Sequence, residues 1–179
     1  MLDNIGDINP NVLFAKEGLI KVDEKGNVLS WDVWCQRMGG AGYIKLNDNS
    51  NIDIRNKVEK ILEEIQMDKN YKIMDVMTGL NAKVSRNGMY NADYVIISEP
   101  GYEVRENPIG TYIINSPTQM AQHGYVEELY DMKAVLFLKG REIPVNKDLG
   151  EFDLIDIAPT LANIMGFEMN DVDGINRIK

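Results

Sequence analysis

Cysteine and histidine are almost absent from this sequence, which has one of each, Cys35 and His123, among 179 residues. A single cysteine excludes an internal disulfide, so we expect a fold that does not depend on an oxidising compartment. The sequence offers no second histidine or other evident base to make Cys35 a nucleophile. We therefore interpret it as a small buried apolar residue.

Basic residues are also scarce, since 19 lysines and arginines stand against 28 acidic residues and give a net charge of −9. This charge balance argues against binding to the phosphate backbone of nucleic acid and against binding to anionic membranes. No apolar run approaches membrane-spanning length, so we expect no membrane partner. The N-terminus lacks the charged-then-apolar pattern of a signal peptide, which favours the cytoplasm over export.

What is present is enough apolar sequence, 44% of residues, to bury the core of one domain, or of one domain with a small appendage. The clearest element is an amphipathic helix over residues 51–66, whose charged residues alternate with an apolar face. That face consists of Ile54, Val58, Ile61, Leu62 and Ile65. Strands at 71–76 and 92–98 follow this helix, and the alternation of strands with helices predicts an α/β or compact α+β arrangement.

The first forty residues predict a short helix and then a hairpin. Asn9 is placed to cap the helix, Pro10 suits its first position and Gly18 suits a left-handed stop. Residues 19–22 and 28–33 follow as two strands around a polar turn.

A glycine cluster at 39–42 introduces a further strand at 43–46. A phosphate cradle of the P-loop kind would need a lysine and a helix directly after the glycines. Both are missing here, so we interpret the cluster as a tight turn into the strand.

The C-terminal third predicts a strand and a helix. Ala134–Leu138 is continuously apolar, which is typical of a strand covered on both faces. We expect the face of Ile157, Leu161 and Ile164, on a helix capped by Asp156 and stopped by Gly166, to pack on that strand. Pro159 fits this helix only in its first turn, which favours Asp156 over Asp153 as the cap.

Residues 170–174 imitate the middle of a calcium-binding loop. Met169 would occupy the first ligand position and no closing glutamate follows, so we interpret the stretch as a turn.

His123 lies beside Gly124 in the loop that leads to the 134–138 run. A histidine there is placed to hold a metal ion at the rim of a sheet. Taken alone, however, a single imidazole is more often a hydrogen-bonded loop or core residue than a ligand.

The order of several motifs favours the interpretation of His123 as a metal ligand. His123-Gly124-Tyr125 is followed by Asp131-Met132, then by Asp156-Ile157-Ala158-Pro159-Thr160, Met165-Gly166 and Asp173-Gly174. In this order and spacing the sequence resembles the C-terminal part of the type I phosphodiesterase/nucleotide pyrophosphatase family of the alkaline phosphatase superfamily. Residues 11–20, 39–46, 92–94 and 100–102 resemble it too, so the likeness covers nearly the whole chain.

The resemblance implies a partial alkaline-phosphatase-like α/β sheet with helices that carries a small α+β insert. Residues 1–17 would continue the core as an N-terminal helix, and residues 18–106 would form the insert. Residues 107–179 would be the C-terminal part of the core, with the His-Gly loop.

It also implies a chemistry. Members of the family hydrolyse phosphodiester or pyrophosphate bonds with two metal ions, usually zinc, and a Thr or Ser nucleophile. The last metal ligand of the family is the histidine of its His-Gly motif, which corresponds to His123. The implied cofactor is therefore zinc, and the implied substrate of the intact enzyme is a phosphodiester or a nucleotide.

The departures from the family pattern concern the rest of the site. In the family, the nucleophile and the other five metal ligands lie upstream, in a region that ends in an Asp-His-Gly motif, and this chain contains no Asp-His pair. Glu127, Glu128 and Asp131 are the acids nearest to His123, but we interpret them as ordinary loop residues. We therefore expect a C-terminal fragment that is inactive alone, whose first partner is the missing N-terminal part.

Two alternatives stay open. The chain could be a non-catalytic binding module, or one that associates with itself through exposed sheet edges. It could also belong to a sulfatase or a phosphomutase of the same superfamily, and the nucleophile would distinguish these from a phosphodiesterase.

Overall fold

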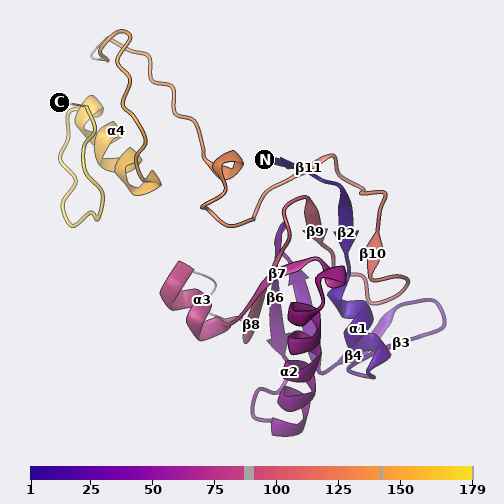
Figure 1. The fold of residues 1–179 in the computed structure, drawn as a ribbon. Coiled ribbons are helices and arrows are strands. Elements are labelled where there is room, and N and C mark those ends of the chain that lie inside the picture. Colours follow the sequence, from indigo (N-terminus) through magenta and orange to yellow (C-terminus); the bar gives the residue numbers. More distant parts are fainter. Residues whose placement is uncertain (87–90, 142, 179) are drawn as a thin grey trace. The chain divides into compact units, whose positions relative to one another are not determined.

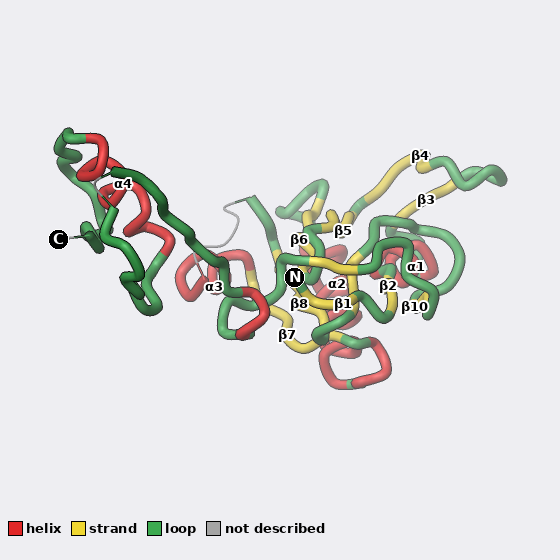
Figure 2. The backbone as a smooth tube through the Cα atoms, turned by 90° about the horizontal axis from the view of Figure 1, so that it is seen from above, coloured by secondary structure: helices red, strands yellow, loops and turns green. Residues whose placement is uncertain are grey.

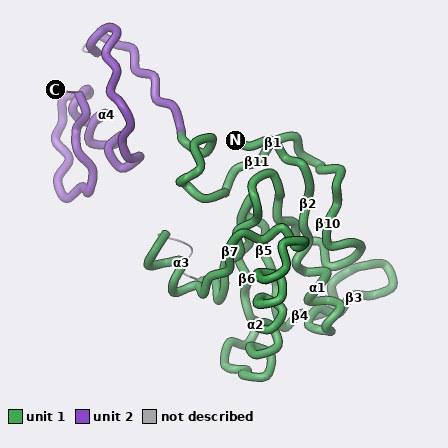
Figure 3. Tube along the Cα trace, viewed as in Figure 1, with its two compact units in different colours: residues 1–133 green, residues 134–179 purple. Residues whose placement is uncertain are grey.

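The computed structural model describes residues 1–86, 91–141 and 143–178. The chain forms two compact units, Met1–Lys133 and Ala134–Lys179, shown in Figure 3. The fold is mixed α/β, as the sequence predicts, with several small sheets and four α-helices among the described residues (Figure 1).

A four-stranded antiparallel sheet forms the centre of the first unit, with the strand order β5-β6-β8-β7. Its strands are β5 (Val33–Arg37), β6 (Ala41–Leu46), β7 (Ile73–Thr78) and β8 (Tyr94–Ser98). Ile44 of β6 and Ile96 of β8 are fully buried, because these two strands are central and covered.

Helix α2 (Ile52–Met67) packs on this sheet, as its sequence pattern predicts (Figure 1). Asn51 caps the helix, since its side chain accepts a hydrogen bond of 3.2 Å from the Ile54 amide. Val58, Ile61, Leu62 and Ile65 are the buried residues of the helix, and all belong to the core. A short 3-10 helix, Lys69–Tyr71, leads from α2 into β7.

Helix α1 (Pro10–Lys16) and the β3–β4 hairpin also follow the predictions. The hairpin strands are β3 (Ile20–Val22) and β4 (Val28–Trp31), and the hairpin projects from the sheet (Figure 2). Pro10 takes the first helical position and Gly18 has a φ of 75°. The predicted cap is wrong in one respect: the Asn9 side chain donates to the Thr111 carbonyl at 3.3 Å and makes no capping bond.

Two smaller sheets join distant parts of the first unit. Strand β2 (Gly6–Ile8) lies between β9 (Tyr102–Val104), with which it is parallel, and β10 (Ile113–Ile114), with which it is antiparallel. Strand β1 (Leu2–Asp3) pairs with β11 (Ala121–Gln122), and helix α3 (Gly79–Arg86) follows β7. The N-terminal segment is thereby fixed to the segment that leads to His123.

The second unit contains helix α4 (Ile157–Met165), preceded by a 3-10 turn over Leu154–Asp156. The helix ends at Gly166, whose φ of 79° confirms the predicted left-handed stop. Asp156 stands at the predicted N-cap but makes no capping bond with the helix amides. Its carboxylate instead accepts from the Ile175 amide at 2.7 Å and from Arg177 Nε at 2.6 Å.

The predicted strand Ala134–Leu138 is wrong for the described chain. These residues form no strand, and the side chain of Phe137 is 90% exposed. Leu161 of α4, which was expected to pack on the strand, is 39% exposed. The physical reason is that a strand needs a neighbouring strand to bond its amides, and no described strand pairs with this run.

No helix in the described part of the chain has the length and apolarity needed to cross a bilayer.

Two isoleucines of α2 provide a matched test of the core. Ile65 is 1% exposed and Ile52 is 69% exposed. We expect Ile65→Ala to lower the free energy of unfolding by about 2–5 kcal/mol, because it leaves a cavity against the sheet. Ile52→Ala should change it by less than about 0.5 kcal/mol. Urea denaturation followed by circular dichroism measures both values, and equal losses would contradict the packing described here.

Candidate functional site

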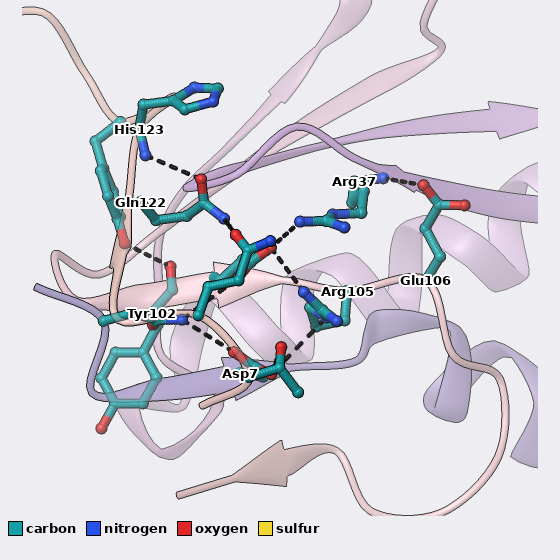
Figure 4. Close-up of polar contacts among 12 residues, drawn as sticks. Asp7, Arg37, Tyr102, Arg105, Glu106, Gln122 and His123 are labelled. Atoms are coloured by element: carbon teal, nitrogen blue, oxygen red, sulfur yellow. Dashed lines mark hydrogen bonds and ion pairs between the residues drawn. The ribbon is translucent and has the colours of Figure 1, made fainter. Parts of the chain in front are cut away.

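His123 directly follows β11, and its side chain is exposed, as the sequence predicts for a loop beside a strand (Figure 4). The backbone amide of His123 donates to Gln122 Oε1 at 3.1 Å. Within the described part of the chain, no hydrogen bond or ion pair engages the imidazole. The ring is thus open to a ligand from outside, while its backbone is held.

The backbone of His123 is held by the glycine turn between β5 and β6. The Gly40 amide donates to the His123 carbonyl at 2.8 Å. A Cβ at Gly39 would lie 2.1 Å from the same carbonyl oxygen, and a Cβ at Gly124 would lie 2.1 Å from the Met38 carbonyl oxygen. No side chain fits between the two segments, so glycine is required on both sides of the contact.

Tyr125 extends this contact to the next residues. A Cβ at Gly40 would lie 2.2 Å from Tyr125 Cδ1, so the ring packs directly on the glycine. The Tyr125 hydroxyl donates to the Tyr102 carbonyl at 3.1 Å. Burial raises the pKa of Tyr125 to about 12, so the phenol stays a hydrogen-bond donor at a higher pH than an exposed tyrosine would. The predicted tight turn is confirmed at Gly39 and Gly40, whereas Ala41 and Gly42 already belong to β6. The contact of this turn with the His123 loop is a role that sequence reasoning missed.

A buried charged network lies beneath the same region (Figure 4). Asp7 of β2 and Glu103 of β9 are paired neighbours in parallel strands, and they are 1% and 0% exposed. Arg105 Nη1 donates to Glu103 Oε1 at 3.0 Å, and its Nε lies 3.8 Å from Asp7 Oδ2. Arg37 of β5 also bonds Glu103. Two guanidinium groups therefore balance two carboxylates that water does not reach.

Asn4 and Thr118 connect this network to the strands around His123. Asn4 Nδ2 donates to Asp7 Oδ1 at 3.1 Å and to Glu103 Oε2 at 3.3 Å. The Thr118 hydroxyl donates to Asp7 Oδ2 at 3.4 Å. Asn4 also fixes the approach to β11, because its amide donates to the Met120 carbonyl at 2.9 Å.

Sequence reasoning missed this network. Asn4 and Glu103 are 99 residues apart in the chain, and each stands in a short stretch without periodicity. The weak signal that could have found them is a charged residue inside a run with strand propensity, such as Glu103 between Tyr102 and Val104.

The acids near His123 have other roles. Glu127 Oε2 and Glu128 Oε2 accept from Arg86 Nη1 at 3.3 Å and 3.0 Å, as expected for ordinary loop acids. The backbone carbonyl of Asp131 accepts from the N-terminal ammonium at 3.0 Å. A hydrogen bond from the backbone of Glu128 itself, and then the bond from Arg86, hold the pKa of the Glu128 carboxyl below its usual range.

The described residues do not fit a complete zinc site. A catalytic zinc takes three protein ligands and leaves one position open. In residues 1–86, 91–141 and 143–178, no group of three histidine, cysteine, aspartate or glutamate side chains converges as a metal site would require. His123 can supply one ligand, and no reaction step through a metal follows from this chain by itself.

In the comparison with known proteins, no family model matches this chain, and no solved structure matches it.

Gly39 and Gly18 offer a matched test of the backbone contact, because their φ angles are 77° and 75°. Alanine at either position meets the same backbone strain, about 1–2 kcal/mol. Only at Gly39 does it also collide with the His123 carbonyl, since nothing lies within 4 Å of a Cβ at Gly18. We expect Gly39→Ala to shift the imidazole NMR signals of the sole histidine and to unfold at lower urea than Gly18→Ala. Unchanged imidazole signals in a folded Gly39→Ala protein would contradict the proposed contact.

The buried network predicts that the loss of a buried glutamate lowers the free energy of unfolding more than the loss of an exposed one. Glu103→Ala should lower the free energy of unfolding by about 1–3 kcal/mol, because it removes the buried carboxylate that Asn4, Arg37 and Arg105 share, while both arginines keep partial contact with water. Glu17 pairs with Lys57 at 3.6 Å in an exposed ion pair. Glu17→Ala should therefore cost less than about 1 kcal/mol in the same urea titration. Similar losses for the two variants would show that the Glu103 network does not stabilise the fold.

Proposed function

We propose that this chain is the C-terminal part of a two-metal phosphodiesterase or nucleotide pyrophosphatase, with His123 as one metal ligand. The observation that carries the proposal is the state of His123. Its imidazole is exposed and unengaged by the described residues, while its backbone is clamped by the Gly39–Gly40 turn. A metal ligand needs this combination of an available lone pair and a fixed position.

The motif order supports the same proposal. The His-Gly-Tyr motif at 123–125 and the Asp-Ile-Ala-Pro-Thr motif at 156–160 follow the order of the family that the sequence resembles. The latter motif forms the N-terminal end of α4, where Asp156 is 3% exposed and binds the backbone of Ile175. We infer that this aspartate is a structural residue and that the motif has no part in metal binding.

The coordination count assigns the remaining groups to polypeptide outside these 179 residues. A single neutral imidazole contributes one ligand and no charge, whereas two divalent ions need several anionic ligands for charge balance. In the proposed enzyme those ligands and the nucleophile come from the N-terminal part. A sulfatase or phosphomutase would present a different nucleophile there, so that residue decides between the reactions.

The proposal predicts that hydrolysis requires the longer polypeptide. With bis(p-nitrophenyl) phosphate and Zn²⁺, the 179-residue chain should show no turnover above background. A polypeptide extended at the N-terminus through the nucleophile and Asp-His-Gly segments should be active. In that longer protein, His123→Ala should lower kcat/KM by at least about 100-fold, since loss of a ligand exceeds the loss of a second-sphere partner.

Glu127→Ala is the control, because Glu127 lies in the same loop and binds Arg86 at 3.3 Å. It should leave kcat/KM within about twofold, as expected for a change at an exposed ion pair. Zinc-dependent turnover by the short chain, or full activity of His123→Ala, would end the proposal.

A further inference from the structure

The second unit exposes most of its large apolar side chains. Among its described residues, only Ala162 and Ile178 are buried apolar residues, while Asp156 and Thr160 are buried polar ones. The exposed apolar residues are Val135, Phe137, Val145, Leu154, Ile155, Leu161, Met165, Phe167, Met169, Val172 and Ile175. Such a concentration of exposed apolar groups marks an interaction surface.

One segment of this surface also lacks backbone partners. Residues 134–139 take part in no hydrogen bond with any described residue. Val135 and Phe137 are 76% and 90% exposed, so one set of alternate side chains is open to solvent. A continuous apolar run whose backbone amides and carbonyls have no partner among the described residues is able to pair with the edge strand of a sheet.

We propose that Ala134–Leu138 is added as a β-strand to a sheet edge of another polypeptide segment, and that acidic residues flank the receiving strand. A lipid bilayer cannot be the occupant of the segment, because lipid offers no partner for the free backbone groups. A protein strand satisfies both the backbone and the side chains, as in other cases of strand addition.

The flanking charges disfavour a second copy of the segment as the receiving strand. Lys133 and Lys139 border the apolar run on its two sides. Antiparallel pairing of two copies about Leu136 would place Lys133 opposite Lys139, and parallel in-register pairing would place each lysine opposite itself. Like charges directly opposite one another destabilise a strand pair, and opposite charges stabilise it. Acidic flanks on the receiving strand follow from this rule.

The inference does not depend on the proposed hydrolase, because no metal or substrate enters it. Its probe is a synthetic peptide with an alternating valine and threonine centre and two glutamates at each end. A second peptide has the same centre and lysine ends. Hydrogen exchange of the full chain, read by mass spectrometry, reports whether amides 134–138 become protected.

We expect the glutamate-ended peptide to slow exchange in this segment and to bind about fivefold more tightly than the lysine-ended one, given two cross-strand charge pairs. Reversal of the flanks by Lys133→Glu with Lys139→Glu should invert the preference. Phe137→Asp should abolish protection, whereas Val84→Asp, at an equally open position of α3 that is 77% exposed, should leave it unchanged.

Five results would overturn the inference. Protection of 134–138 in the dilute chain alone would mean that the chain covers the segment itself. Protection that grows with protein concentration would identify a second copy, and protection by anionic lipid vesicles would identify a membrane. Failure of both peptides to protect the segment, or equal binding of the two, would remove the strand-addition model.

Discussion

The first unit depends on a contact between two backbones that leaves no room for side chains. The Gly39–Gly40 turn lies against His123–Gly124, and the Gly40 amide bonds the His123 carbonyl at 2.8 Å. Because β5 and β6 belong to the central sheet, this contact transmits the rigidity of that sheet to a loop far away in the sequence. A loop histidine is usually mobile, but here the glycine turn and the β1–β11 pair fix the backbone on both sides.

The charged network beneath the loop adds a requirement of a different kind. Asp7 and Glu103 could not be buried separately, since an unpaired carboxylate in the interior is costly. Side by side on β2 and β9, they are balanced by Arg37 and Arg105, and that balance fixes which strands can be neighbours. Such networks add little net stability compared with an apolar core, but removal of one member is costly. We therefore interpret this network as a determinant of strand pairing around the histidine loop.

How much of the fold the sequence predicts depends on how local the information is. Helix α2 could be placed because its apolar spacing lies within the helix itself. The β9 strand and the Asp7–Glu103 pairing could not, because their partners are distant in the chain and the strands are short. For the candidate site, the exposed loop position of His123 was predicted, but the glycine contact that holds it was not. A glycine cluster in the sequence indicates that another segment approaches the backbone closely, but only the structure identifies that segment.

The wrong strand at Ala134–Leu138 carries a further lesson about what a hydrophobic pattern reports. An apolar run indicates that its side chains need to be buried against other residues. It does not indicate whether those residues belong to the same chain. In unit one the requirement is met, so α2 and β8 lie where their patterns predict. In the second unit it is not met by the described residues, and the side chain of Phe137 stays exposed.

His123 has an unmet requirement of its own, because one imidazole cannot complete a coordination sphere. A missing strand neighbour and missing metal ligands are separate deficits with separate chemistry. Polypeptide that supplied acidic strand edges need not supply metal ligands, so each proposal stands or falls on its own measurement.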